Sequence, residues 1–491
     1  MAVIGVDLDR ELAHVDRRIL GGFVEHLDRC VYGGIYDEKS PLSDDRGLRK
    51  DVLEAVRRLR PPVLRWPGGN FVSGYHWVDG IGPKELRPRR MELAWHVEES
   101  NRFGTDEFMA FCEEVGAEPY LCLNMGTGTL DEAQAWVEYC NGTGNTEWAN
   151  RRRANGREAP YEVRYWGLGN EMYGPWQIGQ HSAEDYVKQA RQWAKVLRWT
   201  DPTVQLVSCG EKGWTDWDET VIRGLAEFVN WHSVHLYTGS DDYWPDVLSP
   251  HAAERALRVT AALIEKERYN QRINHPIHVA YDEWNVWLTG RSGAEGHGGV
   301  YNLADALAVA TYLHAFVRHA AVVKMANLAM LVNVIAPIVT NEDGLFLQTI
   351  YHPLRLFADH LGTSSIDVHV SSDQHEYANP ETNERDRVAD LGPFPVLDAV
   401  ATLSTSRQKL MLSVVNRSPD ADVTAELHFH GAFDPVGACV EEVNGPDWTA
   451  RNSFQQPDAV SVEQRQLGPV TSGMTYRFPS HSHTVITVDL R

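Results

Sequence analysis

The chain has 491 residues, more than one ordinary domain core of about 100–200 residues accommodates, so two domains are expected. Its 43 % hydrophobic and 23 % charged residues are typical of a soluble globular protein. The formal net charge of −22 argues against nucleic acid or an anionic membrane as a partner, because both need a basic surface.

Cysteine usage and hydropathy indicate a cytoplasmic protein. The six cysteines form no C-x-x-C pair and are too sparse for a disulfide framework, so buried, reduced thiols are expected. The opening residues, MAVIGVDLDRELAHVD, carry acidic side chains early and no long apolar core, unlike a signal peptide. No apolar run reaches the roughly 18 residues of a membrane span, since the longest candidate, 325–339, is interrupted by Asn327, Asn333 and Pro337.

Short apolar runs in the first three quarters of the chain predict β-strands, and each is followed by a helical pattern. The predicted strands are 21–26, 62–66, 119–124, 163–168, 204–208, 231–237, 277–282 and 324–333. The predicted helices include 51–60, 106–115, 185–199 and 252–269, of which 106–115 has Thr105 as its expected N-cap and Gly116 as its C-cap. Strands that alternate with helices predict a parallel sheet, and this number of units predicts an α/β fold, a closed (β/α)₈ TIM barrel.

After about residue 365 the helical period ends and short alternating runs take over, at 410–415, 423–429 and 484–490. This pattern predicts a C-terminal all-β domain, a jelly roll or sandwich. The segment 2–7 also alternates, and we expect it to pair into the C-terminal sheet. The predicted domains are therefore a catalytic barrel, 18–365, and a β-sandwich made of 1–17 plus 366–491.

The stretch YWGLGNEMYG at 165–174 has two interpretations. A dinucleotide loop requires a third glycine at position 172, which is Met172, and no Lys-Ser/Thr of a phosphate loop follows. In a barrel, strands deliver catalytic side chains at their carboxyl ends, where Asn170 and Glu171 follow the fourth predicted strand. A carboxyl group buried among aromatic rings can act as a general acid. A glutamate in a loop salt bridge remains the alternative reading.

A second acidic motif, AYDEWNVW at 280–287, follows the seventh predicted strand. Asp282 and Glu283 are adjacent, so on an extended strand only one of them is expected to face the barrel mouth, and we assign Glu283 at the strand end. Glu171 and Glu283 would then face one central mouth. Two carboxyl groups about 5–5.5 Å apart are the apparatus of a retaining glycosidase, in which one is the acid/base and the other the nucleophile.

Aromatic composition is consistent with a sugar ligand. The chain contains 16 Trp and 18 Tyr, and several lie at predicted strand ends. Packing in the core and at the rim explains most of them, and stacking on a sugar ring is the other use. These candidates are Trp66, Tyr75, Trp77, Trp95, Trp176, Tyr237 and Trp284.

With both glutamates placed, the chain resembles the α-L-arabinofuranosidases of glycoside hydrolase family 51, which are clan A retaining glycosidases. The resemblance rests on GGFVEHLDRCVYGGIY (21–36), LRWPGGNFVSGY (64–75), ESNRFGTDEF (99–108), GLGNEM with GPWQIG (167–179), YDEWNVW (281–287) and GLFLQTIYHP (344–353). It implies a barrel with a jelly roll and exo-release of terminal arabinofuranosyl residues from arabinan, arabinoxylan or arabino-oligosaccharides. It also implies a homo-oligomer, a hexamer, and chemistry without a metal or an organic cofactor.

The resemblance implies a role for each matching residue. Glu171 is the implied acid/base and Glu283 the implied nucleophile. The residues implied to bind the sugar are Asn170 at the 2-hydroxyl, Glu25 and Asn70 at other hydroxyls, Trp95, and Gln348 from the eighth strand. Arg65 would lie beside the nucleophile, where its positive charge would help to keep Glu283 ionised. Tyr237 would hydrogen-bond the nucleophile or the ring oxygen.

The chain departs from the family pattern at two places. Tyr173 stands where an acidic residue is expected, close to the side of the leaving group. The run SVHLYTG at 233–239 also differs, which leaves His235 as the alternative to Tyr237.

Other functional classes have weaker support. A metal-dependent barrel hydrolase would show H-x-H at the first strand end, where Glu25-His26 stands, or H-E-x-x-H. The pairs His428/His430 and His481/His483 lie in the predicted sandwich and are expected to be surface histidines. No G-x-S-x-G of a serine hydrolase occurs. A sugar-binding protein without activity would need no paired carboxylates. Within the glycosidases, the alternative is an endo-β-glucanase or β-xylosidase that uses the same two glutamates.

Overall fold

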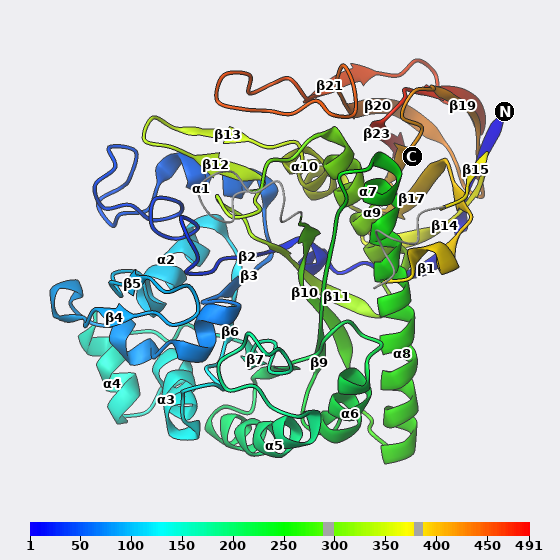
Figure 1. The fold of residues 1–491 in the computed structure, drawn as a ribbon. Helices are drawn as coiled ribbons and strands as arrows, with labels where there is room; N and C mark the ends of the chain where they lie inside the picture. The colour runs from blue at the N-terminus through cyan, green and yellow to red at the C-terminus, as the bar shows by residue number, and fades with distance from the viewer. Residues whose placement is uncertain (288–298, 378–385) are drawn as a thin grey trace.

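The computed structural model describes residues 1–287, 299–377 and 386–491, and its centre is a closed barrel of eight parallel strands (Figure 1). Each predicted strand is present, so the predicted fold class is confirmed. In barrel order the strands are β10 (His278–Val286), β11 (Val323–Ala329), β2 (Gly21–Phe23), β3 (Val63–Trp66), β6 (Glu118–Cys122), β7 (Tyr165–Leu168), β8 (Gln205–Ser208) and β9 (Trp231–Thr238).

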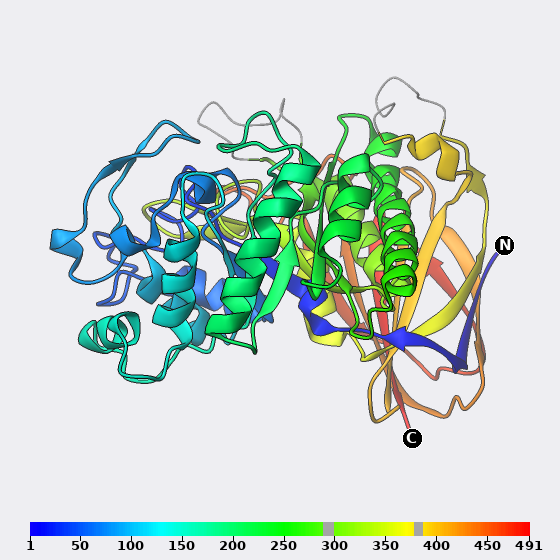
Figure 2. The ribbon, with the colours of Figure 1, turned by 90° about the horizontal axis from the view of Figure 1, so that it is seen from below.

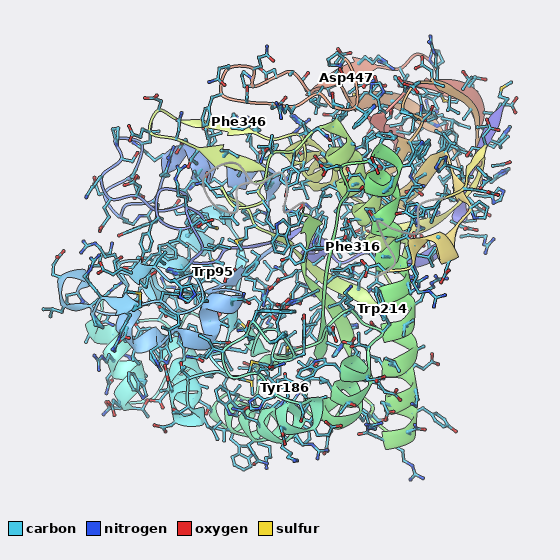
Figure 3. All side chains as sticks on the ribbon, viewed as in Figure 1. Trp95, Tyr186, Trp214, Phe316, Phe346 and Asp447 are labelled. Carbon is cyan, nitrogen blue, oxygen red and sulfur yellow. The ribbon has the colours of Figure 1, made fainter. Side chains whose placement is uncertain are left out.

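Helices surround the barrel (Figure 1). They are α1 (Lys50–Leu59), α2 (Thr105–Val115), α3 (Leu130–Asn141), α4 (Glu147–Ala154), α5 (Ala183–Thr200), α6 (Asp216–Leu225), α7 (Tyr243–Leu248), α8 (Ala252–Gln271), α9 (Leu303–Arg318) and α10 (Tyr351–His360). Tyr186 on α5 and Phe316 on α9, both labelled in Figure 3, are fully buried. The Tyr186 hydroxyl donates to the carbonyl of Leu168 at the end of β7, which fixes the helix to that strand end.

The start of α2 differs from the prediction. Gly104, not Thr105, is the N-cap, while Gly116 ends the helix in the left-handed conformation as predicted. The Thr105 hydroxyl is buried and accepts a hydrogen bond from the Trp136 indole at 3.1 Å. Glu107 instead reaches back to the backbone N–H of Gly104 at 2.8 Å and completes the cap.

A separate cluster of buried side chains fills the barrel where its strands begin. It consists of Val63, Tyr120, Tyr165, Val207, Trp231, Ala280 and Met325. The interior of the barrel is therefore a packed core rather than a pore, and the carboxyl ends of the strands are left to build a site.

The second large sheet has nine strands and joins the two ends of the chain. Its order is β21 (Ser461–Gln466), β20 (Pro435–Asn444), β23 (Ser482–Leu490), β18 (Lys409–Asn416), β17 (Leu397–Leu403), β14 (Ser364–Ser371), β1 (Ala2–His14), β19 (Val423–His430) and β22 (Gly473–Phe478). As expected, the N-terminal strand pairs into it, antiparallel to β14 and parallel to β19, and Figure 2 shows β1 crossing from this sheet toward the barrel. The domain boundaries at 17/18 and 365/366 stay a prediction.

Two further expectations can be compared with the described residues. All six cysteines are free, and all are buried except Cys439, which is half-buried. No helix in 1–287, 299–377 or 386–491 is long and apolar enough to cross a bilayer.

A buried polar chain joins the barrel to the sheet. His314 on α9 contacts Asp398 of β17 through Nδ1 at 2.8 Å and Ser413 of β18 through Nε2 at 2.8 Å. Ser413 Oγ also lies 2.8 Å from His483 Nε2 on β23. One arrangement of protons satisfies all three bonds: neutral His483 donates to Ser413, Ser413 to neutral His314, and His314 to Asp398.

The expectation that His481 and His483 are surface residues is wrong, because both are buried. His481 lies in the turn before β23, and α9 of the barrel covers the face of the sheet that contains His483. Burial, together with the neighbouring His314, lowers the pKa of His483 to about 3. In the other pair, His428 and His430, the side chain of His430 is exposed, so the expectation of a surface histidine is confirmed for that residue.

The buried His483 predicts acid lability. An unfolded histidine takes up a proton below about pH 6.5, whereas the folded protein resists protonation of His483 down to about pH 3. The free energy of unfolding should therefore fall through this window, at a rate of up to about 1.4 kcal/mol per pH unit from this group. We expect His483→Gln to lower the melting temperature at pH 7 but to flatten its decline between pH 7 and 4.5.

Circular dichroism melts over that pH range measure both slopes. His430→Gln is the matched control in the same sheet and should keep the wild-type slope. Equal slopes in His483→Gln and the wild type would contradict the assignment.

Candidate active site

A cavity of about 590 Å³ opens at the carboxyl ends of the barrel strands. Glu171 and Glu283 both line it, together with Glu25, Asn70 and Trp95. The loop after β8 adds Glu211 and Lys212, and the C-terminal part of the chain adds Asp386, which forms an ion pair with Lys212. The residues that line the cavity thus extend from position 25 to position 386 of the chain.

A β-bulge in β10 turns two adjacent carboxylates into the barrel. The register of β10 shifts between Ala280 and Glu283 against β9, and between Tyr281 and Trp284 against β11. Arg65 Nε lies 3.6 Å from Asp282 Oδ2, and Arg65 Nη1 lies 2.6 Å from Glu283 Oε1.

The expectation that only one of Asp282 and Glu283 faces inward is therefore wrong, because a bulge removes the strict alternation of an extended strand. Glu283 also does not end its strand, which continues to Val286.

Glu171 lies on a tight turn just after β7. Gly169 and Glu171 both have positive φ, 80° and 42°, and a non-glycine residue in this region is strained. The turn points the Glu171 carboxylate at two aromatic donors. The Tyr173 hydroxyl donates to Oε1 at 3.1 Å, and the Trp176 indole N–H donates to Oε2 at 2.7 Å.

His235 on β9 links the two glutamates. Its Nδ1 lies 3.0 Å from Glu171 Oε1 and 3.6 Å from Glu283 Oε2, and its Nε2 lies 3.3 Å from Asp282 Oδ1. Burial by itself would lower the pKa of His235, but Glu283, Asp282 and Glu171 together raise it to about 10. His235 is therefore an imidazolium at neutral pH, held among three carboxylates.

The carboxyl groups of the site differ in their electrostatics. Burial raises the pKa of Glu25 to about 8 and the charge of Glu283 adds to the effect, so Glu25 is neutral at pH 7 and can donate a hydrogen bond. Burial also acts to raise the pKa of Glu171, but the hydrogen bond and charge of His235, with the Trp176 N–H, bring it below the ordinary value. Burial would raise the pKa of Asp282 as well, but the positive charges of Arg65 and His235 have the larger effect and lower it.

Arg65 and Asn170 lie behind the cavity wall and are each 1 % exposed. Arg65 Nη2 donates to Asn170 Oδ1 at 2.6 Å, so one guanidinium group orients both Glu283 and Asn170. On the opposite side of Glu283, the Tyr237 hydroxyl donates to Oε2 at 2.8 Å. Each oxygen of Glu283 therefore has its own donor.

Gln348 does not come from the eighth barrel strand. That strand, β11, ends at Ala329, and the hairpin of β12 (Ile338–Thr340) and β13 (Leu345–Leu347) separates it from Gln348. The Gln348 amide nitrogen donates to the carbonyls of Gly299 and Ala336, both at 2.8 Å. In the described structure Gln348 therefore supports the backbone near the cavity and does not line it.

The aromatic candidates divide into two groups. Trp66, Tyr75, Trp77 and Trp284 are buried in the hydrophobic core, as the packing explanation predicts. Trp95, Trp176 and Tyr237 line the cavity. Trp95, labelled in Figure 3, donates from its indole to Glu25 Oε1 at 3.3 Å, and Trp176 remains 53 % exposed. The exposed indole of Trp176 lies beside the carboxylate that it orients.

The sequence offered His235 only as the alternative to Tyr237 and assigned Asp282 no place in the site, whereas the structure places both His235 and Tyr237 at the glutamates. His235 and Tyr237 are two residues apart on one strand, so alternation places them on the same face. The bulge that admits Asp282 has no comparable signature. Lys212 and Asp386 belong to loops far apart in the sequence, and only folding brings them together.

Glu171, His235 and Glu283 offer ligand atoms within 4.8 Å of one another, close enough to surround a divalent cation. A metal on His235 Nδ1 would have to displace a proton that three carboxylates hold, and both oxygens of Glu283 already accept hydrogen bonds. Chemistry without a metal stays a prediction.

Two family models match the chain: an α-L-arabinofuranosidase 1 domain over residues 55–249 and an α-L-arabinofuranosidase C-terminal domain over 282–482. A probable α-L-arabinofuranosidase C of Aspergillus clavatus is 45 % identical, over 98 % of this chain and 96 % of the relative. An intracellular exo-α-(1→5)-L-arabinofuranosidase 1 of Bacillus subtilis is 35 % identical, over 98 % and 97 %.

Solved structures give the same result. The α-L-arabinofuranosidase of Thermotoga maritima in complex with arabinose superposes with a TM-score of 0.91 at 40 % identity, with full coverage of both chains. A family 44 xyloglucanase of Paenibacillus polymyxa shares the fold alone, with a TM-score of 0.65 at 12 % identity and 99 % coverage of both chains.

The raised pKa of His235 predicts that its imidazole stays protonated well above neutral pH. In the ¹³C-histidine NMR spectrum of the wild type, the His235 signal should keep its imidazolium shift at pH 8 and titrate near pH 10. The His235→Gln spectrum identifies the signal by its disappearance, and exposed His430 is an internal reference. A His235 midpoint below pH 7.5 would show that the carboxylates do not hold the proton.

Proposed function

Because this chain belongs to the α-L-arabinofuranosidases of glycoside hydrolase family 51, we propose that it removes terminal arabinofuranosyl residues by a retaining double displacement. The chain is a glycoside hydrolase with α-L-arabinofuranosidase activity. The observation that carries the proposed mechanism is the convergence of Glu171 and Glu283, whose oxygens approach within 4.8 Å at one cavity.

In the first step Glu283 attacks the anomeric carbon. Its oxygens are oriented by Arg65 on one side and Tyr237 on the other. As the bond from the anomeric carbon to Glu283 forms, the glycosidic C–O bond breaks and the leaving oxygen takes a proton from Glu171. At rest this proton lies on His235 Nδ1, 3.0 Å from Glu171 Oε1, and transfer along that hydrogen bond supplies it.

In the second step Glu171 acts as the base. It accepts a proton from water, the water oxygen bonds to the anomeric carbon, and the ester bond to Glu283 breaks. Two inversions at the same carbon restore the original anomeric configuration. Neutral Glu25 can donate to a sugar hydroxyl, while Asn70 and Trp95 form the neighbouring wall of the cavity.

The substrates that we propose are arabinan, arabinoxylan and arabino-oligosaccharides, cut from their non-reducing ends. Charge supports a neutral sugar, because among the described residues five carboxyl groups line the cavity, of which Glu25 is neutral, against the two cations Lys212 and His235. The five are Glu25, Glu171, Glu211, Glu283 and Asp386.

We also propose that the enzyme is a cytoplasmic homo-oligomer, a hexamer. The name of the Bacillus subtilis relative, which is intracellular, supports the location. Exposed apolar side chains on and beside the hairpin of β4 (Arg90–Met91) and β5 (Glu98–Glu99) support association. They are Leu86, Met91, Leu93 and Val97, between 49 % and 80 % exposed.

The proposed mechanism predicts retention of configuration. Proton NMR early in the hydrolysis of an aryl α-L-arabinofuranoside should show the α-anomer of arabinofuranose before mutarotation. Glu283→Gln should lower kcat by a factor on the order of 10³–10⁶, because no nucleophile remains. First formation of the β-anomer would contradict the mechanism, and hydrolysis of only a β-xyloside or soluble cellulose would contradict the substrate.

The acid role of Glu171 predicts a dependence on the leaving group. Glu171→Ala should lose a factor of roughly 10²–10⁴ on arabino-oligosaccharides, whose leaving oxygen needs a proton, and much less on a dinitrophenyl arabinofuranoside. Glu211→Ala is the matched control, since it removes a carboxylate from the same cavity and should affect both substrates alike. Equal losses on both substrates in Glu171→Ala would remove Glu171 from the acid role.

A further inference from the structure

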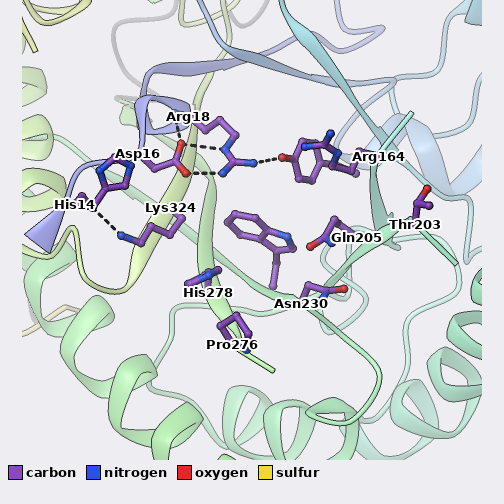
Figure 4. Close-up of a pocket in the computed structure, with 12 residues that line it drawn as sticks. His14, Asp16, Arg18, Arg164, Thr203, Gln205, Asn230, Pro276, His278 and Lys324 are labelled. Atoms are coloured by element: carbon purple, nitrogen blue, oxygen red, sulfur yellow. Dashed lines mark hydrogen bonds and ion pairs between the residues drawn. The ribbon is translucent and has the colours of Figure 1, made fainter. Parts of the chain in front are cut away.

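A second cavity, also of about 590 Å³, lies at the opposite end of the barrel from the catalytic glutamates. The starts of five consecutive barrel strands form its wall, at Tyr165, Gln205, Trp231, His278 and Lys324. The segment that connects β1 to β2 closes one side with His14, Asp16 and Arg18 (Figure 4). This cavity has no part in the reaction proposed above.

Basic side chains dominate this cavity, although the chain as a whole carries a net charge of −22. Five of the lining residues are basic: His14, Arg18, Arg164, His278 and Lys324. Asp16 is the one carboxylate among the lining residues, and Arg18 already engages both of its oxygens. The remaining positive charge at the cavity therefore comes chiefly from Lys324 and Arg164.

Lys324 forms no direct ion pair in the described part of the chain. Its ammonium group donates to the backbone carbonyls of His14, at 2.7 Å, and Ala320. Across the described ranges no carboxylate lies within 4.0 Å of Lys324 Nζ. Burial lowers the pKa of His278, and the nearby positive charge of Lys324 adds to the effect. A bound anion would offset the charge of Lys324.

Arg164 contributes a second positive charge at the rim. It lies at the edge of the cavity with its side chain 57 % exposed, and its nearest carboxylate among the described residues, that of Glu118, is 3.7 Å away and similarly exposed. Such a pair is weak in water, so the guanidinium can turn toward a ligand at little cost.

Neutral polar groups complete the wall. The side-chain amide of Gln205, at the start of β8, has no hydrogen-bond partner in the described part of the chain and can bond a hydroxyl group. The indole N–H of Trp231 is buried and likewise unpartnered there. A basic wall next to free hydrogen-bonding groups fits a ligand that carries both a charge and hydroxyls.

We propose that this cavity binds a small polyhydroxylated anion, a sugar phosphate or sugar carboxylate, through Lys324 and Arg164, with Gln205 bonding its hydroxyls. Such a ligand would connect the β1–β2 segment, which comes from the nine-stranded sheet, to the strand starts of the barrel. It would therefore stabilise the junction of the two sheets and leave the catalytic cavity untouched.

Calorimetry and thermal melts of the full-length protein test this proposal. The probes are inorganic phosphate, a pentose 5-phosphate and a pentonate, at pH 7 and constant ionic strength, with neutral arabinose in parallel. We expect the anions to bind and to raise the melting temperature. Comparison of the pentose 5-phosphate with the pentonate shows whether the site prefers a phosphate group or a carboxylate group. Lys324→Gln and Arg164→Gln should each weaken anion binding about ten-fold or more, which corresponds to about 1.4 kcal/mol.

The controls separate this site from the catalytic one. Lys195→Gln, on the outer helix α5, should bind the anions as the wild type does, and all three variants should hydrolyse aryl arabinofuranosides at the wild-type rate. Because Arg164 is largely exposed, its replacement tests the proposal even if Lys324→Gln fails to fold. Anion binding that is absent from the wild type, unchanged in Arg164→Gln, or competed by arabinose would overturn the proposal. None of these results bears on the retaining mechanism.

Discussion

The buried guanidinium group of Arg65 is the interaction on which the catalytic end of the barrel depends. Within one side chain it contacts Glu283, Asp282 and Asn170, and it is 1 % exposed. Carboxylates cannot be buried together without compensating positive charge, because each loses its hydration. Arg65, with the imidazolium of His235, provides that charge. The two cations allow Glu171, Asp282 and Glu283 to converge.

The positions of these two cations also give the carboxyl groups of the site different protonation states. Asp282 contacts both Arg65 and His235, and these two cations keep its carboxyl group ionised. Glu171 lies 3.0 Å from the imidazolium of His235, which holds the pKa of that carboxyl group below its ordinary value. Glu25, buried beside the charge of Glu283, stays neutral and can donate. Position relative to the two cations, rather than residue type, separates these roles.

The two ends of the barrel carry opposite charge. Carboxylates dominate the catalytic cavity, which suits a neutral sugar, whereas basic groups surround the cavity at the strand starts. Both cavities include segments from outside the barrel: Asp386 at the first, and the end of β1 at the second. The nine-stranded sheet contributes the end of β1 to the second cavity, and the buried His314–Ser413–His483 chain fixes the sheet to the barrel.

Periodicity and strand-end motifs are local properties of the chain, so they were enough to predict the barrel strands, the all-β domain with its N-terminal strand, and the presence of Glu171 and Glu283 at one cavity. Folding was needed to show that Asp282 turns inward at a bulge, that His235 links the glutamates, that Gln348 supports the backbone, and that His483 is buried. Each of these depends on which surfaces meet after folding. A bulge, an inter-domain contact and an ion pair arise between segments distant in sequence, so no local pattern encodes them.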